Sequence, residues 1–137
     1  MYTIERHAGR LVEVRQIAMV PMGLEEILAM RDTLLAVVRA ATESVVTCYD
    51  LRQAALFAPP VAEEVADMMR QINPKLDRSA IVVPTDRATF ALQMERLVRA
   101  GGVASRRTFR SAKRAADWLA EVLSDEEKAR LRVFLDL

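Results

Sequence analysis

The sequence is poor in the residues that build disulfides, metal centres and redox sites. It contains one cysteine, Cys48, and one histidine, His7, in 137 residues. An intramolecular disulfide therefore cannot form, and cysteine and histidine ligands for a zinc ion cannot be assembled. The chain also lacks the GxGxxG and P-loop lysine patterns that bind nucleotides. We accordingly expect no metal and no cofactor.

Aromatic residues and net charge are scarce as well. Aromatics make up 5% of the chain, and 20 basic residues against 19 acidic ones leave a net charge of +1. Stacking platforms and basic surfaces, which nucleic-acid-binding proteins use, are therefore not indicated. The sequence predicts no nucleic-acid partner and at most a peripheral contact with membranes.

Long apolar runs are missing too. No stretch of about 18 or more apolar residues is present, so we expect no transmembrane helix. The first seven residues, Met-Tyr-Thr-Ile-Glu-Arg-His, lack the apolar core of a signal peptide. We expect a cytoplasmic location.

The composition is that of a globular protein, with 52% hydrophobic and 28% charged residues. Its length suits a single domain spanning residues 1–137 with a substantial core. Residues 44–52, Ser-Val-Val-Thr-Cys-Tyr-Asp-Leu-Arg, are apolar on both faces of an extended chain. Such a strand is covered on both faces, so we expect it at the centre of a sheet.

Alternating and helical patterns order the rest of the chain. Two alternating segments flank a turn at Gly9, which predicts an N-terminal β-hairpin. Helical spacing follows, then the central strand, and then helices and short strands in turn. The order is ββαβαβαβαα, an α/β fold with a mixed sheet of about five strands. Two further strands are expected over residues 79–84 and 103–109. The periodicity leaves open whether the helices cover one face of the sheet or both.

Several residues are expected to begin helices. Pro59 and Pro60 suit a first helical turn, and Asp86 and Ser111 suit N-cap positions. Residues 124–127, Ser-Asp-Glu-Glu, fit a capping box for the last helix.

This arrangement resembles the STAS fold and, more narrowly, the SpoIIAA-like (STAS/SEC14-type) family of small bacterial proteins. The likeness rests on the opening hairpin, on residues 49–52 (Tyr-Asp-Leu-Arg) and on residues 107–111 (Arg-Thr-Phe-Arg-Ser) followed by a helix with Trp118. The resemblance implies a domain used for regulation and protein interaction, and some relatives suggest apolar-ligand or lipid binding. It also implies a phosphorylatable serine after the central strand. Residues 50–60 contain no serine or threonine, so we do not expect that switch here.

Two segments offer a partner or ligand surface. Asp50 and Arg52 end the central strand, where they either face a partner or serve the local turn. Leu56 and Phe57, with Ala58, are expected to be exposed before Pro59, and an exposed apolar loop needs a cover. A protein partner, or a second copy in a homodimer, would supply it.

A basic cluster around residues 106–114 is the second segment. It includes Arg107, Arg110 and Arg114, which either bind an anionic group or protect an edge strand as solvated charges. An alternative function follows from it: a small-molecule or lipid-binding module. Its pocket would lie between sheet and helices near Met68, Met69 and Phe90, with an anionic headgroup on Arg107 or Arg110.

Catalytic chemistry has little support in the sequence. Cys48 lies in an apolar strand without an adjacent base and is interpreted as buried packing. His7 is interpreted as a surface residue of the turn. We expect no catalytic residue and interpret the chain as a non-enzymatic regulatory or scaffold domain that acts through protein–protein interaction.

Overall fold

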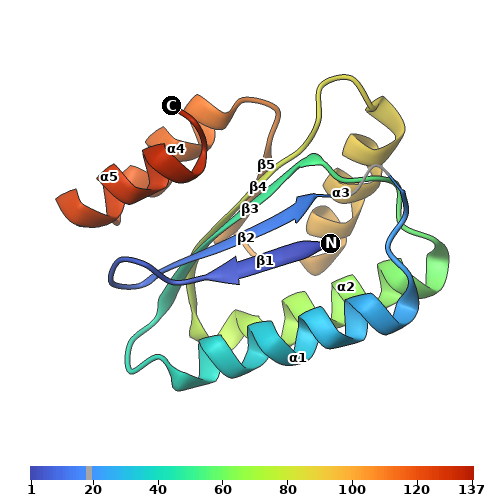
Figure 1. Ribbon diagram of the computed structural model, residues 1–137, viewed down its shortest axis with the longest axis horizontal. Helices are drawn as coiled ribbons and strands as arrows, with labels where there is room; N and C mark the ends of the chain where they lie inside the picture. The colour runs from blue at the N-terminus through green and yellow to red at the C-terminus, as the bar shows by residue number, and fades with distance from the viewer. Residues whose placement is uncertain (18–19) are drawn as a thin grey trace.

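The computed structural model describes residues 1–17 and 20–137, which form a five-stranded sheet with helices on both faces (Figure 1). The strands lie across the sheet in chain order: β1 (Tyr2–Glu5), β2 (Leu11–Ile17), β3 (Val45–Gln53), β4 (Leu76–Val82) and β5 (Arg106–Phe109). The α-helices are α1 (Leu24–Ala40), α2 (Pro59–Ile72), α3 (Ala88–Gly101), α4 (Ala112–Ala120) and α5 (Asp125–Phe134). A short 3-10 helix, η1 (Asn73–Lys75), joins α2 to β4. Among the described residues, no helix is long and apolar enough to cross a membrane.

The pairing confirms the predicted hairpin and mixed sheet. β1 is antiparallel to β2, and β2, β3, β4 and β5 pair in parallel. The hairpin turns at Gly9, whose φ of +51° is the left-handed region that glycine reaches without a Cβ penalty.

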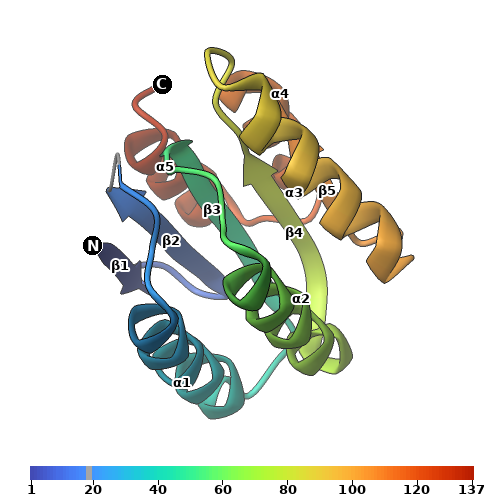
Figure 2. The same ribbon diagram turned by 90° about the vertical axis from the view of Figure 1, so that its right-hand side faces the viewer.

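The helices cover both faces of the sheet, which the sequence left open. Each crossover from β2 to β5 moves one strand further in the same direction. Because such crossovers are right-handed, α1, α2 and α3 all lie on one face. The chain then passes the edge strand β5, and α4 and α5 cover the other face (Figures 1 and 2).

The central position of β3 is confirmed. Its residues Val45–Leu51 are all buried. Tyr49 and Leu51 point into the larger core beneath α1, α2 and α3, while Val46 and Cys48 point into the smaller core beneath α4 and α5. This alternation is the pleat of a strand that is covered on both faces.

The helix starts match the sequence in part. Ser111 caps α4, and Ser124 and Glu127 form the predicted capping box, with bonds of 2.8 and 3.2 Å. Asp86 was expected to cap α3, and this is wrong. The helix begins at Ala88 behind Arg87, without a side-chain cap, and the exposed Asp86 carboxylate lies 3.8 Å from the Arg87 guanidinium.

The edge strand is shorter than predicted and begins at Arg106 instead of residue 103. Gly102 ends α3 in the left-handed conformation, with a φ of +68°, and a turn follows at residues 104–105. This connection uses the first residues of the predicted strand.

Candidate functional site

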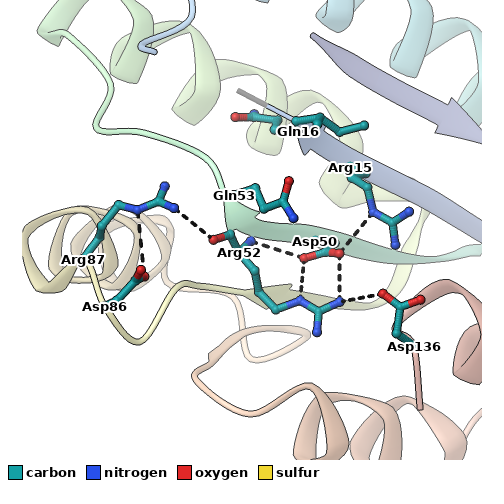
Figure 3. A pocket seen from close by; sticks show the side chains of 9 residues that line it. Arg15, Gln16, Asp50, Arg52, Gln53, Asp86, Arg87 and Asp136 are labelled. Atoms are coloured by element: carbon teal, nitrogen blue, oxygen red, sulfur yellow. Dashed lines mark hydrogen bonds and ion pairs between the residues drawn. The ribbon is translucent and has the colours of Figure 1, made fainter. Parts of the chain in front are cut away.

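A cleft of about 570 Å³ opens at the carboxyl ends of β2 and β3 (Figure 3). This is the edge at which open α/β sheets place ligands, because the loops that follow parallel strands meet there. We call it the Asp50 cleft. Its walls come from β2, β3, the loop after β4 and the C-terminal segment: Arg15, Gln16, Ile17, Asp50, Arg52, Gln53, Asp86, Arg87 and Asp136.

Asp50 is the centre of the charge network in this cleft. Strand pairing places Arg15 directly opposite Asp50, and its Nε donates to the carboxylate at 3.1 Å. Arg52, two residues further along the same face of β3, donates to both carboxylate oxygens, at 2.9 and 3.0 Å, and its backbone N–H adds a bond of 3.2 Å.

The environment keeps Asp50 ionised. The residue is 6% exposed, and burial by itself would raise the pKa of the carboxyl group. Hydrogen bonds from Arg52 and Arg15 outweigh burial, so the pKa of Asp50 lies below its usual value. The carboxylate is therefore a fixed negative charge that orients two guanidinium groups.

Both guanidinium groups also hold the C-terminal segment. Arg15 donates to the Phe134 carbonyl, and its guanidinium lies 4.5 Å from the centre of the Phe134 ring. Arg52 donates to the Leu135 carbonyl at 3.3 Å and approaches the Asp136 carboxylate at 4.0 Å. The segment after α5 thus forms one wall of the Asp50 cleft (Figure 3).

Arg87 closes the opposite wall. Its guanidinium donates to the carbonyls of Ala54 and Arg52, the second at 3.5 Å, and contacts Asp86. These bonds tie the loop after β4 to the loop after β3. The cleft therefore has side chains of both signs in defined positions.

The loop after β3 differs from its prediction. Phe57 was expected to be exposed but is 3% exposed, because its ring packs edge-on against Phe90 at a centroid distance of 5.3 Å. Its backbone N–H and C=O both bond to the Gln93 side chain, at 2.9 and 2.8 Å. Leu56 is exposed as expected, at 44%, and lines a shallow groove that includes Leu92 of α3.

The predicted basic cluster does not form one patch. Arg106 is buried on the face of the sheet that α1, α2 and α3 cover, where it donates to the Met69 carbonyl of α2. Arg107 stacks on Trp118, 4.8 Å from the ring centre, and Arg110 pairs with Glu95 at 3.0 Å. Arg114 is exposed on α4. Of these residues, Arg110 comes near the central strand's end, since it lines a second cleft of about 430 Å³ with Arg52 and Asp86.

The pocket expected near Met68, Met69 and Phe90 is filled by side chains. Met68, Met69, Phe57 and other core residues leave a cavity of about 10 Å³ there, which is the space of about one water molecule at most. Phe90 itself is fully packed against Phe57.

Cys48 and His7 lie where they were expected. Cys48 is fully buried, and burial raises the pKa of its thiol. His7 is exposed in the hairpin turn, but it has a partner that sequence reasoning missed: its Nε2 lies 2.7 Å from the Glu5 carboxylate. With Glu13, these residues form the one group of three potential metal ligands within the described part of the chain. Glu13 is already bound by Arg130 through two bonds of 2.7 and 2.8 Å.

Of the nine residues that line the Asp50 cleft, the sequence predicted Asp50 and Arg52 as site residues and missed the other seven. Arg15, Arg87 and Asp136 come from segments far from Asp50 along the chain. A signal existed for Arg15, because it lies near the end of an alternating strand, and the ends of neighbouring parallel strands meet at one edge. Asp136 follows the last helix, and no sequence pattern indicated it as a site residue.

These elements define an α/β domain with an N-terminal hairpin, three crossover helices on one face and a charged cleft at the carboxyl edge. No protein-family model matches the sequence, and no curated protein matches it. Solved structures do match. The anti-sigma factor antagonist SpoIIAA, in its unphosphorylated form, is 12% identical with a TM-score of 0.63, covering 90% of this chain and 100% of SpoIIAA.

An uncharacterized Shewanella loihica protein of the DUF3478 family, described as having a SpoIIAA-like fold, is 16% identical with a TM-score of 0.63. That match covers 87% of this chain and 92% of the other. The chain therefore has the SpoIIAA-like fold that the sequence predicted.

Proposed function

We propose that this protein is a non-enzymatic regulatory or scaffold domain that binds a protein partner at the Asp50 cleft and the adjoining Leu56 loop. The observation that carries the proposal is the Arg15–Asp50–Arg52 network, a set of opposite charges fixed at the carboxyl edge of the sheet. Fixed charges of both signs favour a complementary surface and disfavour others, so they give specificity in recognition.

The surface beside the cleft supports a macromolecular partner. Leu56 is 44% exposed and follows Gln53, a wall residue of the cleft, by three positions. An apolar side chain next to a polar rim is the usual composition of a protein interface. The match to SpoIIAA, an anti-sigma factor antagonist, supports the same class of function through the fold.

The start of α2 supports a mode of action without the serine switch. The N-cap residue is Ala58, which has no side-chain hydroxyl, and Pro59 begins the helix. Because residues 50–60 contain no serine or threonine, phosphorylation there cannot control binding. We infer that partner release depends on affinity or on the partner's own state.

The lipid-binding alternative has less support. It requires a pocket between the sheet and the helices, and the cavity at the proposed place is about 10 Å³. An acyl chain would have to displace several packed side chains of the larger core, because a close-packed interior leaves no space for it.

Affinity capture with matched variants tests the proposal. The purified chain is immobilised and exposed to an extract of its own host, and retained proteins are quantified by mass spectrometry. Leu56→Asp changes the loop beside the cleft, and Val133→Asp is the control. Val133 is 63% exposed and lies on α5. Light scattering reports whether a second copy is the partner.

The expected result is one or more proteins, or a self-associated dimer, retained by the wild type and by Val133→Asp and lost from Leu56→Asp. Equal capture by all three chains would overturn the proposed surface. Thermal unfolding of each variant shows whether a lost partner reflects a lost fold.

A further inference from the structure

The outer side of β1 is an open edge of the sheet. Within residues 1–17 and 20–137, the sheet ends at β1, which pairs only with β2. β1 is the strand nearest the viewer in Figure 1, and it again borders the sheet in Figure 2. An edge strand presents backbone N–H and C=O groups to which another strand can pair, and proteins commonly block this pairing with charged side chains or proline.

The two edges of the sheet differ in this protection. Both edge strands are four residues long, so length protects them equally. β5 contains two arginines, Arg106 and Arg107, and Arg110 follows it. β1 reads Tyr-Thr-Ile-Glu and has one charge, on Glu5 at its end. Its first three residues are of types that favour strands, so β1 is the edge better suited to pairing.

The direction of the β1 backbone groups follows from one hydrogen bond. The Ile17 N–H donates to the Met1 carbonyl at 2.8 Å, and the hairpin register, extended by one residue, places these two residues opposite each other. Opposite residues that share a bond form a hydrogen-bonded pair, and such pairs alternate along an antiparallel ladder. Thr3 therefore bonds to β2, while the N–H and C=O groups of Tyr2 and Ile4 point to the open edge.

This pattern is self-complementary about a two-fold axis perpendicular to the sheet. With Thr3 on the axis, Tyr2 of one copy lies opposite Ile4 of the other, and each presents an N–H and a C=O to its partner. The two residues can exchange a pair of hydrogen bonds, and symmetry repeats that pair on the other side of the axis. No outward backbone group of β1 is then left without a partner.

Side chains also match in this register. Tyr2 and Ile4 are half-buried and pack against the larger core, so they lie on the same face of the sheet. Opposed aromatic and β-branched side chains stabilise a pair of strands, and so do opposed threonines, as the two copies of Thr3 would be on the other face. Glu5 lies opposite Met1 of the second copy, so the two Glu5 carboxylates do not face each other.

We propose that the chain forms a homodimer in which β1 pairs antiparallel with β1 of a second copy, joining two five-stranded sheets into one. The axis reverses the strand direction, so the two Asp50 clefts open in opposite directions and both stay accessible. The interface uses the four residues of β1 from each copy, whereas a standard interface uses about 20 a side, so the dimer is weak and reversible. It involves neither the Asp50 cleft nor the Leu56 loop and is independent of the proposed function.

Amide hydrogen exchange, followed in nitrogen–proton spectra of the full chain, tests the register. Raising the protein concentration should slow exchange at Tyr2 and Ile4, because their N–H groups become hydrogen-bonded only in the dimer. Exchange at Thr3 and Glu5 should change less, because their N–H groups bond to β2 in both states. Sedimentation equilibrium over the same concentrations measures the dissociation constant of the dimer.

Charge variants separate the β1 edge from other surfaces. Thr3→Lys places two ammonium groups opposite each other on the axis, and Thr108→Lys places the same charge on the opposite edge strand. Leu56→Asp changes the loop proposed to bind a partner. We expect the dissociation constant to rise at least about fivefold in Thr3→Lys and to stay unchanged in the other two. Thermal unfolding shows whether each variant is folded.

A second pair of variants isolates the backbone. Tyr2→Ala and Tyr2→Pro remove the same side chain, but proline also removes the outward N–H and leaves the bonds to β2 in place. We expect Tyr2→Pro to dimerise about tenfold more weakly than Tyr2→Ala, because symmetry doubles the loss of one hydrogen bond. This pair keeps the test valid if Thr3→Lys fails to fold.

Three results would overturn the proposal. One is a wild-type chain that stays monomeric at every concentration. Another is a dimer that Leu56→Asp dissociates and a folded Thr3→Lys chain retains, which would assign self-association to the Leu56 loop. The third is equal slowing of exchange at Thr3 and Ile4, or equal dimerisation of Tyr2→Pro and Tyr2→Ala, since the open-edge hydrogen bonds would then be absent.

Discussion

Arg15 of β2 lies directly opposite Asp50 of β3, and its Nε donates to the Asp50 carboxylate at 3.1 Å. Arg52 donates to the same carboxylate from two residues further along β3, on the same face of the strand. One acid thus holds two arginines, and both arginines bind carbonyls of the C-terminal segment. Asp50 therefore links the centre of the sheet to the end of the chain.

Asp50→Asn should lower the free energy of unfolding. The amide keeps the shape of the side chain but removes the negative charge that two arginines share, each about one-third exposed, and Arg52 is left with the more distant Asp136 carboxylate at 4.0 Å. Hydrogen bonds to charged groups are typically worth 1.5–3 kcal/mol, so we expect a loss of about 2 kcal/mol in urea unfolding. The control is Asp86→Asn, whose exposed carboxylate lies 3.8 Å from its partner and should cost less than about 0.5 kcal/mol. Equal losses in the two variants would contradict a central role for Asp50.

Stability should fall in acid in a way that depends on Asp50. The pKa of Asp50 is lowered in the folded state, so the folded chain resists protonation more than the unfolded chain does. The stabilisation is present above the unfolded pKa of about 3.9 and is lost as the pH falls through the lower folded pKa. We expect the gap in unfolding free energy between wild type and Asp50→Asn to shrink between pH 7 and pH 2.5. A gap of constant size over that range would show that the carboxylate charge is not the cause.

Leu56 and Phe57 are adjacent in the chain, but replacing each with alanine should change the free energy of unfolding by very different amounts. Phe57→Ala removes a buried ring from its contact with Phe90 and should cost about 3–4 kcal/mol. Leu56→Ala removes an exposed side chain and should cost less than about 1 kcal/mol, since little apolar area leaves a buried site. Urea unfolding of the two variants measures both values. Similar costs would show that the Phe57 ring does not anchor this loop.

Local patterns account for the parts of the fold that were predicted. Alternation and the Gly9 turn indicate the hairpin, and the apolar run around Cys48 indicates a strand covered on both faces. The direction in which the crossovers step is a tertiary property, so the coverage of both faces could not be predicted. The start of α3 was misplaced because Asp86 has the right type for a cap but contacts Arg87 instead.

The candidate site was predicted only where it coincides with a strand end. Asp50 and Arg52 end the central strand, so topology alone suggests them. Arg15 is 35 residues away from Asp50, and the contact between them depends on strand register, which a single sequence does not reveal. Phe57 was misjudged for a similar reason: its burial comes from Phe90, on a helix that begins 31 residues later.

Gly9 should tolerate alanine poorly for two separate reasons. Its φ is +51°, and a Cβ at this position would overlap the Glu127 carboxylate. That carboxylate is buried and accepts from the Arg10 and Ser124 backbone N–H groups at 2.6 and 2.8 Å. It cannot move without losing the Arg10 bond, which holds α5 to the hairpin, or the Ser124 bond, which caps α5.

Gly102→Ala isolates the backbone part of this effect. Gly102 has a similar φ of +68°, and apart from its chain neighbours and its own helix no described atom lies within 4 Å of the point that an alanine Cβ would occupy. It should cost about 1 kcal/mol, the usual penalty for a left-handed alanine. Gly9→Ala should cost about 2–4 kcal/mol, because strained hydrogen bonds to a charged group add to that penalty. If urea unfolding gave the same value for both, the approach of a Cβ to the Glu127 carboxylate would add no cost, and the hydrogen bonds of Glu127 would not hold that carboxylate in place.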